Sequence, residues 1–504
     1  MYFSFETITA FVGVFIVTYI IYWVKKPRIS KNEPPMVPYK IPIIGHTLNY
    51  LFNAEKFLAE CRQQHGDPFN IYVFGQVNTI VGNEIAQEVY RTDTFSKSSA
   101  MRDGDSFPLN RVLKILEYPE TLEQVAKTIR EVISAAKLPL YTERMQKQLM
   151  ISINKEIGDC SNPKLIITAN SNFSSMIARP VADILVGQEI SKNEDVVKAF
   201  ADFTKDFASI LVIPPILSFI HPKVHSQVIT LPLRFGWNPI RKHMITLKEH
   251  LRPVLEKRLK DKEILGDKYE PPLDIIEYLL NDPEYGTKVI TDDYLNKICE
   301  FLFFIVVVSI HTTSRHITFA LYDFAGRPEL WDDIYEEQVR IDKECIGELS
   351  PQHINKMVKL DSFVRESLRT FDSALIPLPH KCLESYTFKN GMSIPKGRIV
   401  QTYLMDIHYN TTAYGPEPRS FLPYHGLENN FSASKIDKNY LIFGSGKHAC
   451  PGRFLAVNEI KIGMHKLILN YHIKTPSGKI EEKIHFGPFV SPPVSGLIFE
   501  NRKK

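Results

Sequence analysis

The chain has 504 residues, of which 44% are hydrophobic and 23% are charged, and this balance is typical of a globular protein with a large core. A formal net charge of only +4, with no basic block and no recognisable nucleic-acid motif, excludes a nucleic-acid-binding class. The six cysteines are scattered without a Cys-x-x-Cys pair, which argues against a disulfide framework and for a reducing compartment.

The N-terminus carries an uncharged apolar run of 17 residues, Ile8–Val24. This length is at the short end of membrane-spanning helices, about 17–25 residues. Trp23 at its end, followed by Lys25 and Lys26, favours a membrane interface with the C-terminal side in the cytoplasm. A cleaved signal peptide is the alternative, but a basic n-region and a small-x-small cleavage site are missing. We therefore expect residues 1–26 to form a single N-terminal transmembrane helix.

A proline-rich segment, PPMVPYKIPIIG, follows the apolar run. Proline cannot continue a helix, so residues 27–50 are predicted to form a stiff hinge that orients the body over the membrane. Residues 51–504 show no further shift in composition and no internal repeat, and they are predicted to form one catalytic domain.

The body is predicted to be mainly α with small β-sheets. Short strand-like pieces occur near 69–81, 386–394 and 483–499, and long helical patterns lie between them. The longest pattern runs from Asn296 to Gly326, and its middle, Phe301–Val308, is apolar on every side. Such a helix is expected at the centre of a large protein, and the polar residues that follow argue against a second membrane span.

The strongest signal is the cysteine loop at 443–453, FGSGKHACPGR. It matches Phe-x-x-Gly-x-His-x-Cys-x-Gly at Phe443, Gly446, His448, Cys450 and Gly452. This pattern resembles the haem-binding loop of the cytochrome P-450 superfamily. The resemblance implies the cytochrome P-450 fold, with the Cys450 thiolate as axial ligand to the iron of haem b, where it favours cleavage of the O–O bond.

The other loop positions have physical roles in this interpretation. Gly446 permits the backbone angles of a tight turn around the sulfur. Gly452 lets the following helix approach the porphyrin closely, and His448 binds a haem propionate. Phe443 shields the sulfur from water.

A second resemblance lies in FVRESLR at 363–369, where Glu366 and Arg369 share one helix face. Such pairs are common on solvated helices, but this one precedes the cysteine loop by about 80 residues, as in the family. The resemblance implies a buried charged network whose third member is usually the arginine of Phe-x-Pro-x-Arg. Here the stretch reads FLPYH, so His425 stands where arginine is expected.

The long helix contains VSIHTT at 308–313, which resembles the family's Ala-Gly-x-Asp/Glu-Thr-Thr segment over the haem. The resemblance implies that Thr312 and His311 are catalytic, as the alcohol and the acid of a proton relay. Two alternatives remain. The Thr312 hydroxyl could bond only to the helix carbonyls, and His311 could be a satisfied core residue.

The sequence offers several candidates for the residues that bind the propionates. The family often has a Trp-x-x-x-Arg motif, and no tryptophan of this chain lies at that place. Lys127 or Arg130 is expected to bind a propionate in place of this motif. His380 or Lys381 is also expected to reach a propionate.

The expected pocket linings, 96–120, 200–216, 309–313, 374–378 and 490–494, supply mostly apolar side chains and favour a bulky apolar substrate. The runs HACPGRFLAVNEIK and HTTS are similar to fungal enzymes acting on steroids and diterpenes, so a steroid or terpenoid is favoured over a fatty acid. The chain lacks GxGxxG, so electrons are expected from NADPH–haemoprotein reductase, with Lys447 and Arg453 facing that partner.

The predicted function is a monooxygenase that uses dioxygen at the endoplasmic reticulum membrane, anchored in lipid with the catalytic domain in the cytoplasm. The alternatives are a haem-thiolate isomerase or dehydratase, a fungal secondary-metabolite or fatty-acid hydroxylase, and a non-catalytic haem carrier or sensor. The presence of Thr312 favours the monooxygenase, because isomerase relatives often lose this alcohol.

Overall fold

A computed structural model describes residues 23, 26–41, 43–102, 113–114, 121–211, 216–219, 222–376 and 378–502. Most of the expected transmembrane helix, residues 1–26, lies outside the described residues. The proline-rich segment is partly docked on the body. Asn70 donates to the carbonyls of Pro34 and Pro35, and Arg398 forms a buried ion pair with Glu33 at 2.6 Å. Residues from Glu33 onward therefore belong to the body rather than to a free hinge.

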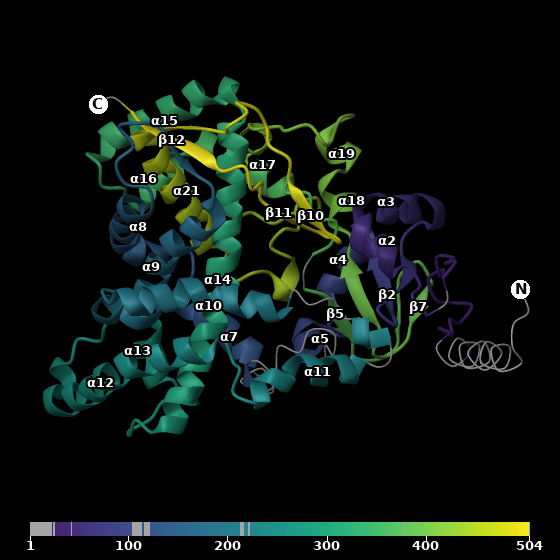
Figure 1. Ribbon diagram of the computed structural model, residues 1–504, viewed down its shortest axis with the longest axis horizontal. Coiled ribbons are helices and arrows are strands. Elements are labelled where there is room, and N and C mark those ends of the chain that lie inside the picture. The colour runs from purple at the N-terminus through teal and green to yellow at the C-terminus, as the bar shows by residue number, and fades with distance from the viewer. Residues whose placement is uncertain are drawn as a thin grey trace, which may run out of the picture.

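One side of the molecule is built on a five-stranded sheet with strand order β1-β2-β8-β5-β3 (Figure 1). Its strands are β1 (Phe69–Val73), β2 (Gln76–Val81), β3 (Phe95–Ser96), β5 (His380–Cys382) and β8 (Ile399–Thr402). Three smaller sheets pair β4 (Lys164–Ile166) and β9 (Tyr471–Lys474) with β12 (Leu497–Asn501), β6 (Tyr386–Thr387) with β7 (Ser393–Ile394), and β10 (Ile484–Phe486) with β11 (Phe489–Ser491). The three strand-like pieces of the sequence are thus confirmed.

Helices form the larger side, and the mainly helical prediction is confirmed. In chain order they are α2 (Thr47–Phe52), α3 (Ala54–His65), α4 (Asn83–Arg91), α5 (Lys97–Arg102), α7 (Thr121–Val132), α8 (Thr142–Glu156), α9 (Ala169–Ile190), α10 (Glu194–Leu211), α11 (Pro222–Arg234), α12 (Arg241–Leu265), α13 (Ile275–Asn281), α14 (Asp292–Ala325), α15 (Trp331–Cys345), α16 (Pro351–Lys356), α17 (Val358–Arg369), α18 (Leu404–His408), α19 (Thr411–Tyr414), α20 (His425–Glu428) and α21 (Arg453–Asn470).

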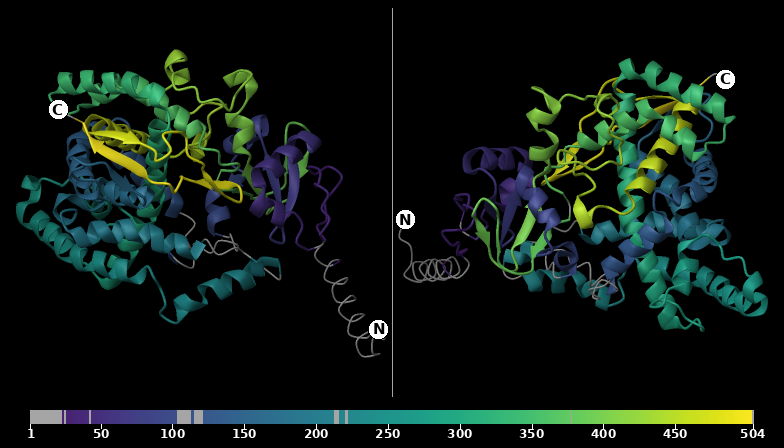
Figure 2. Two further views of the ribbon diagram at one scale, coloured as in Figure 1. Left: turned by 45° about the horizontal axis from the view of Figure 1, so that its top comes forward. Right: turned by 180° about the vertical axis from the view of Figure 1, so that it is seen from behind.

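Helix α14 is the central element, and the expected long buried helix is confirmed. The Thr291 hydroxyl caps its first turn by accepting from the backbone N–H of Tyr294 at 3.1 Å. The helix packs against α9, α10, α12, α17 and α21, between the helical side and the five-stranded sheet (Figures 1 and 2). It is long and apolar enough to cross a membrane, but Phe301–Val306 are wholly buried in the core. The apolar surface of α14 is thus covered by the surrounding helices of the protein.

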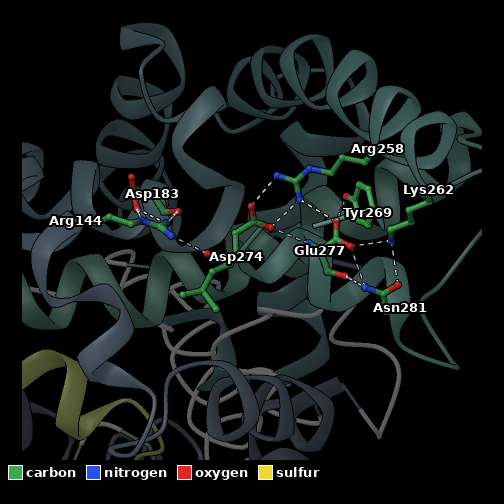
Figure 3. Close-up of polar contacts among 9 residues, drawn as sticks. Arg144, Asp183, Arg258, Lys262, Tyr269, Asp274, Glu277 and Asn281 are labelled. Carbon is green, nitrogen blue, oxygen red and sulfur yellow. Dashed lines mark hydrogen bonds and ion pairs between the residues drawn. The ribbon is translucent and has the colours of Figure 1, made fainter. Parts of the chain in front are cut away.

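A buried charge network joins α12 to α13 (Figure 3). The guanidinium of Arg258 donates to both carboxylate oxygens of Asp274, at 2.8 and 2.7 Å. Asp274 also caps α13 by accepting from the backbone N–H of Glu277. Lys262 pairs with the Glu277 carboxylate at 2.8 Å. Because each buried charge has a partner, the network holds these two helices in one fixed relation.

We expect Gly187→Ala to destabilise this junction by about 2–4 kcal/mol. Gly187 interrupts α9 with a φ of +81°, which L side chains rarely adopt. A Cβ there would overlap the Asp274 carboxylate and lie 3.0 Å from the Arg258 guanidinium. Urea unfolding of the two proteins measures the difference. Gly391→Ala is the control, since Gly391 has a similar φ of +86° but open space around its Cβ position. Equal losses in both variants would contradict a role for the network.

Candidate active site

The cysteine loop folds back on itself so that Cys450 lies between a 3₁₀ turn, Gly446–His448, and the start of α21. The backbone N–H of Cys450 donates to the carbonyl of Phe443 at 2.8 Å. Gly446 has a φ of +59°, and a Cβ there would lie 2.8 Å from the carbonyl oxygen of Tyr90. Only glycine fits this turn, for backbone and for steric reasons.

Burial raises the pKa of the Cys450 thiol, and hydrogen bonding from the Gly452 backbone and the charges of Lys97 and Arg453 act in the opposite direction. Arg453 also donates to the Cys450 carbonyl at 3.0 Å, so this side chain is engaged within the loop. Lys447 pairs with the exposed carboxylate of Asp93. A buried sulfur with two cations close to it suits a thiolate ligand, because a bound metal cation would complete the deprotonation that burial alone opposes.

A basic cluster of Lys97, His380 and His448 lies against the cysteine loop, and burial lowers the pKa values of the two imidazoles, that of His380 to about 2. Lys97 donates to the carbonyl of His448 at 3.1 Å and its Nζ lies 5.2 Å from the centre of the Tyr90 ring. His380 is buried and its ring lies 5.5 Å from that of His448, with its Nε2 unpaired among the described residues. Burial lowers the pKa of Lys97 to about 8. The polypeptide thus gathers three basic side chains at one place, and an anion would complete their pairing.

Lys97 was not anticipated from the sequence. It follows Phe95–Ser96, the short strand β3. The ring of His448 lies 3.1 Å from the carbonyl of Phe95, so the end of β3 is next to the cysteine loop and Lys97 meets a residue 351 positions further along the chain. A single lysine after a two-residue strand carries no pattern that could have revealed it.

The central helix α14 exposes one narrow stripe in an otherwise buried middle. Val308, His311 and Thr312 are exposed, whereas Ile310, Thr313 and Ser314 are buried. The Thr312 hydroxyl donates to the Val308 carbonyl at 2.7 Å. Although part of the His311 surface is open, protein atoms surround most of the imidazole, and this desolvation lowers the pKa of His311 to about 4, with a further lowering from Arg315. At neutral pH the stripe therefore presents a neutral imidazole beside a hydroxyl whose lone pairs remain free to accept.

The Glu366–Arg369 pair is fully buried. The guanidinium donates to both carboxylate oxygens, at 2.7 and 2.6 Å, and also to the carbonyls of His408, Pro418 and Ser420. Glu366 accepts in addition from the backbone N–H of Leu422 at 2.6 Å. These hydrogen bonds therefore connect the end of α17 to residues 408–422, which precede the cysteine loop in the chain.

His425 lies beside this pair and not inside its hydrogen bonds. Its Nδ1 lies 3.3 Å from the side-chain amide of Asn429, and its ring lies 5.0 Å from that of Tyr414. Burial lowers the pKa of His425, and the nearby Glu366 carboxylate raises it. The Arg369 guanidinium and the backbone N–H of Leu422 already donate to the Glu366 carboxylate. His425 therefore interacts with Glu366 and Arg369 only through their charges.

Helix α7 places Lys127 and Arg130 on its exposed face. Lys127 pairs with Asp282 at 3.8 Å, on the side facing α13. Among the described residues, Lys97, His380 and His448 make the cluster at the cysteine loop, and Lys127 belongs to a different contact. The expected propionate role of Lys127 and Arg130 stays a prediction.

The residues present fit a haem group. Cys450 would ligate the iron, Phe443 would cover the sulfur, and Lys97, His380 and His448 would pair with propionates. No heavy atom lies within 4 Å of the position of a Gly452 Cβ, which leaves the start of α21 open to a flat ring. The unpaired Nε2 of His380 is the observation that most directly calls for a hydrogen-bond partner at this place, which a propionate carboxylate would supply.

Comparison with known proteins agrees with this geometry. Residues 34–498 match the family described as Cytochrome P450. Cytochrome P450 monooxygenase 103 of Postia placenta (strain ATCC 44394 / Madison 698-R) is 28% identical over 459 residues, which cover 87% of each chain. Cytochrome P450 monooxygenase olcJ of Penicillium canescens is 24% identical over 351 residues, 68% of this chain and 63% of that protein.

A solved structure described as retinoic acid bound cyanobacterial CYP120A1 has a TM-score of 0.66 at 18% identity, covering 94% of this chain and 100% of that one. This likeness shows the fold. The family match over most of the sequence decides the family: the chain belongs to the cytochrome P450 family and is an oxidoreductase with a haem-thiolate cofactor.

Proposed function

We propose that this enzyme hydroxylates a bulky apolar substrate, with a steroid or terpenoid favoured, using dioxygen and electrons from NADPH–haemoprotein reductase. Haem b is the proposed cofactor, and when bound it supplies the redox chemistry of oxygen activation. The observation that carries the proposal is the exposed pair His311 and Thr312, in the otherwise largely buried middle of α14. A neutral imidazole and a hydroxyl at the surface of an apolar core serve proton transfer better than they serve stability.

The Thr312 hydroxyl is proposed to hold a water molecule and steer a proton. Its own proton points to the Val308 carbonyl, at 2.7 Å, so the oxygen lone pairs are oriented away from the helix axis. His311, one residue earlier and neutral at pH 7, can both donate and accept through its two ring nitrogens. The hydrogen bond to the helix thus orients the alcohol and leaves it able to act.

We expect Thr312→Ala to uncouple NADPH consumption from product formation. The variant loses the acceptor that holds the water, so reducing equivalents should leave as hydrogen peroxide while reduction itself continues. Product per NADPH should fall about tenfold or more. The assay uses membranes with reductase and a steroid and terpenoid panel, with NADPH, peroxide and product measured together.

Thr312→Ser is the matched control, because it keeps the hydroxyl and should keep most of the coupling. Wild-type coupling in Thr312→Ala would remove the residue from the relay. Product formation without NADPH or reductase would instead favour the isomerase or dehydratase alternative.

We also propose that the protein is anchored in the endoplasmic reticulum membrane with its catalytic body in the cytoplasm. The apolar N-terminal run supports this proposal, and so do two exposed aromatic side chains that follow α11. Phe235 and Trp237 are 75% and 80% exposed and lie two positions apart in the chain. Large exposed apolar side chains near one another are typical of a membrane or protein contact.

Deletion of residues 1–26 should weaken membrane binding and leave the haem protein intact. The body begins to dock at Glu33 and Pro34, so the deleted segment contributes none of those contacts. Carbonate-washed membranes and the haem spectrum of the soluble fraction measure the two effects. Some binding should remain, and replacement of Phe235 and Trp237 by serine in the truncated protein should remove it. A truncated protein without haem would contradict the docking boundary.

A further inference from the structure

Arg315 lies on the exposed stripe of α14. At about 100° per residue, it falls inside the arc between His311 and Thr312 and almost in line with Val308. Its position along the axis is about 4.5 Å beyond Thr312, at about 1.5 Å per residue. Its guanidinium therefore projects from the same side of the helix as the proposed proton relay.

The surroundings of Arg315 provide no counter-charge. The guanidinium carbon lies 5.3 Å from the ring centre of Phe371 and 5.9 Å from that of Phe319. Its Nε is buried and, among the described residues, has no hydrogen-bond acceptor and no carboxylate in an ion pair. Aromatic faces compensate a cation only partly, by about 0.5–2 kcal/mol. A partly buried guanidinium whose Nε has no acceptor favours an anionic partner.

Neighbouring ionisable groups do not fill this role. His311 and His316 flank Arg315 on the same helix, and burial lowers their pKa values to about 4 and about 3. Both are therefore neutral at pH 7 and cannot act as anions. The carboxylate of Asp372, next to Phe371 in the chain, already pairs with Lys483 at 2.8 Å and accepts from the Tyr409 hydroxyl.

We propose that Arg315 binds a carboxylate of the substrate, so that the enzyme acts on bulky apolar molecules that carry a carboxylic acid group. This inference rests on the proposed function and narrows its substrate class. The other carboxylates expected nearby are the haem propionates, and Lys97, His380 and His448 gather against the cysteine loop to pair with them. Arg315 therefore remains available to the carboxylate of a substrate that binds against α14.

The test measures ligand binding through an imidazole group, so the natural substrate does not have to be known. Purified haem-loaded protein is titrated with ω-(imidazol-1-yl)alkanoic acids of increasing chain length and with their methyl esters. The imidazole ligates the iron and shifts the Soret band, while the chain carries the carboxylate toward Arg315. At one or more lengths the acid should bind at least about tenfold more tightly than its ester.

Arg315→Gln should abolish this preference, and Arg315→Lys should keep part of it. Arg340→Gln, which removes an exposed arginine on α15, should leave it unchanged. If Arg315→Gln fails to fold, the affinities of acid and ester are compared in the wild type and in Arg315→Lys instead. The proposal then requires an acid preference in the wild type that is smaller in Arg315→Lys. Equal binding of acids and esters at every length overturns the proposal, and so does a preference that survives in Arg315→Gln.

Two further outcomes are distinct from these. Loss of haem in Arg315→Gln, with an unchanged acid preference in the remaining holoprotein, would assign Arg315 to a propionate and overturn the proposal. If imidazole itself gives no Soret shift, no ligand reaches an iron at this place, and the proposed function fails together with the inference.

Discussion

Replacement of Cys450 by serine should abolish the absorbance band near ~450 nm of the reduced carbon monoxide complex, the band that marks thiolate ligation. Serine has nearly the same length, but its hydroxyl is a harder and much less acidic ligand. The charges of Lys97 and Arg453 that oppose the effect of burial on the Cys450 thiol are insufficient to ionise an alcohol. The band should be lost completely, and monooxygenase activity with it.

Cys345→Ser is the matched control for this substitution. Cys345 is also a buried free thiol, 8% exposed, but it lies at the end of α15 and its sulfur lies 3.5 Å from the carbonyl of Asp342. This variant should keep the band at full height. A Cys450→Ser protein with an intact band would show that another group ligates the iron.

Arg369→Lys should prevent accumulation of haem-loaded protein. Lysine cannot reproduce the bidentate pair with Glu366 and the three further bonds to the carbonyls of His408, Pro418 and Ser420. Lysine keeps the positive charge but leaves several buried acceptors without a donor, and each unpaired buried acceptor costs roughly 1–3 kcal/mol. Haem content per polypeptide and the urea midpoint of unfolding measure the effect.

Two variants set the scale of this loss. Lys147→Ala removes an exposed ion pair with Glu143 on α8 and should leave the urea midpoint nearly unchanged. His425→Ala should lower the free energy of unfolding by about 1 kcal/mol. The variant loses one contact with the Tyr414 ring and one side-chain hydrogen bond from Asn429. If His425→Ala is as damaging as Arg369→Lys, then His425 is a full member of the network, as the sequence comparison implied.

The parts of this enzyme that were predictable are those that depend on residues near one another in the chain. The cysteine loop is such a case, because Gly446 and Cys450 are four positions apart and their turn geometry is local. The pair of Glu366 and Arg369 is set by helix periodicity in the same way. The burial of α14 follows from its apolar middle, which no solvated helix could carry.

The residues that escaped prediction depend on long-range packing. Lys97 meets His448 at the end of β3, a contact over 351 positions that no local pattern encodes. Arg315 resembles an ordinary exposed arginine in the sequence, and only the packing of Phe371 from the end of α17 shows that it is partly buried. The docking of Glu33 on Arg398 likewise joins residues 365 positions apart in the chain.

The cluster of Lys97, His380 and His448 has a consequence for the amount of enzyme a cell can maintain. Three basic groups are packed against one loop, and the described polypeptide offers none of them a carboxylate partner. A cofactor that binds only the native state stabilises it in proportion to the logarithm of its free concentration. The fraction of chains that escape proteolysis should therefore follow haem supply, so that cells short of haem lose the protein itself and not only its activity.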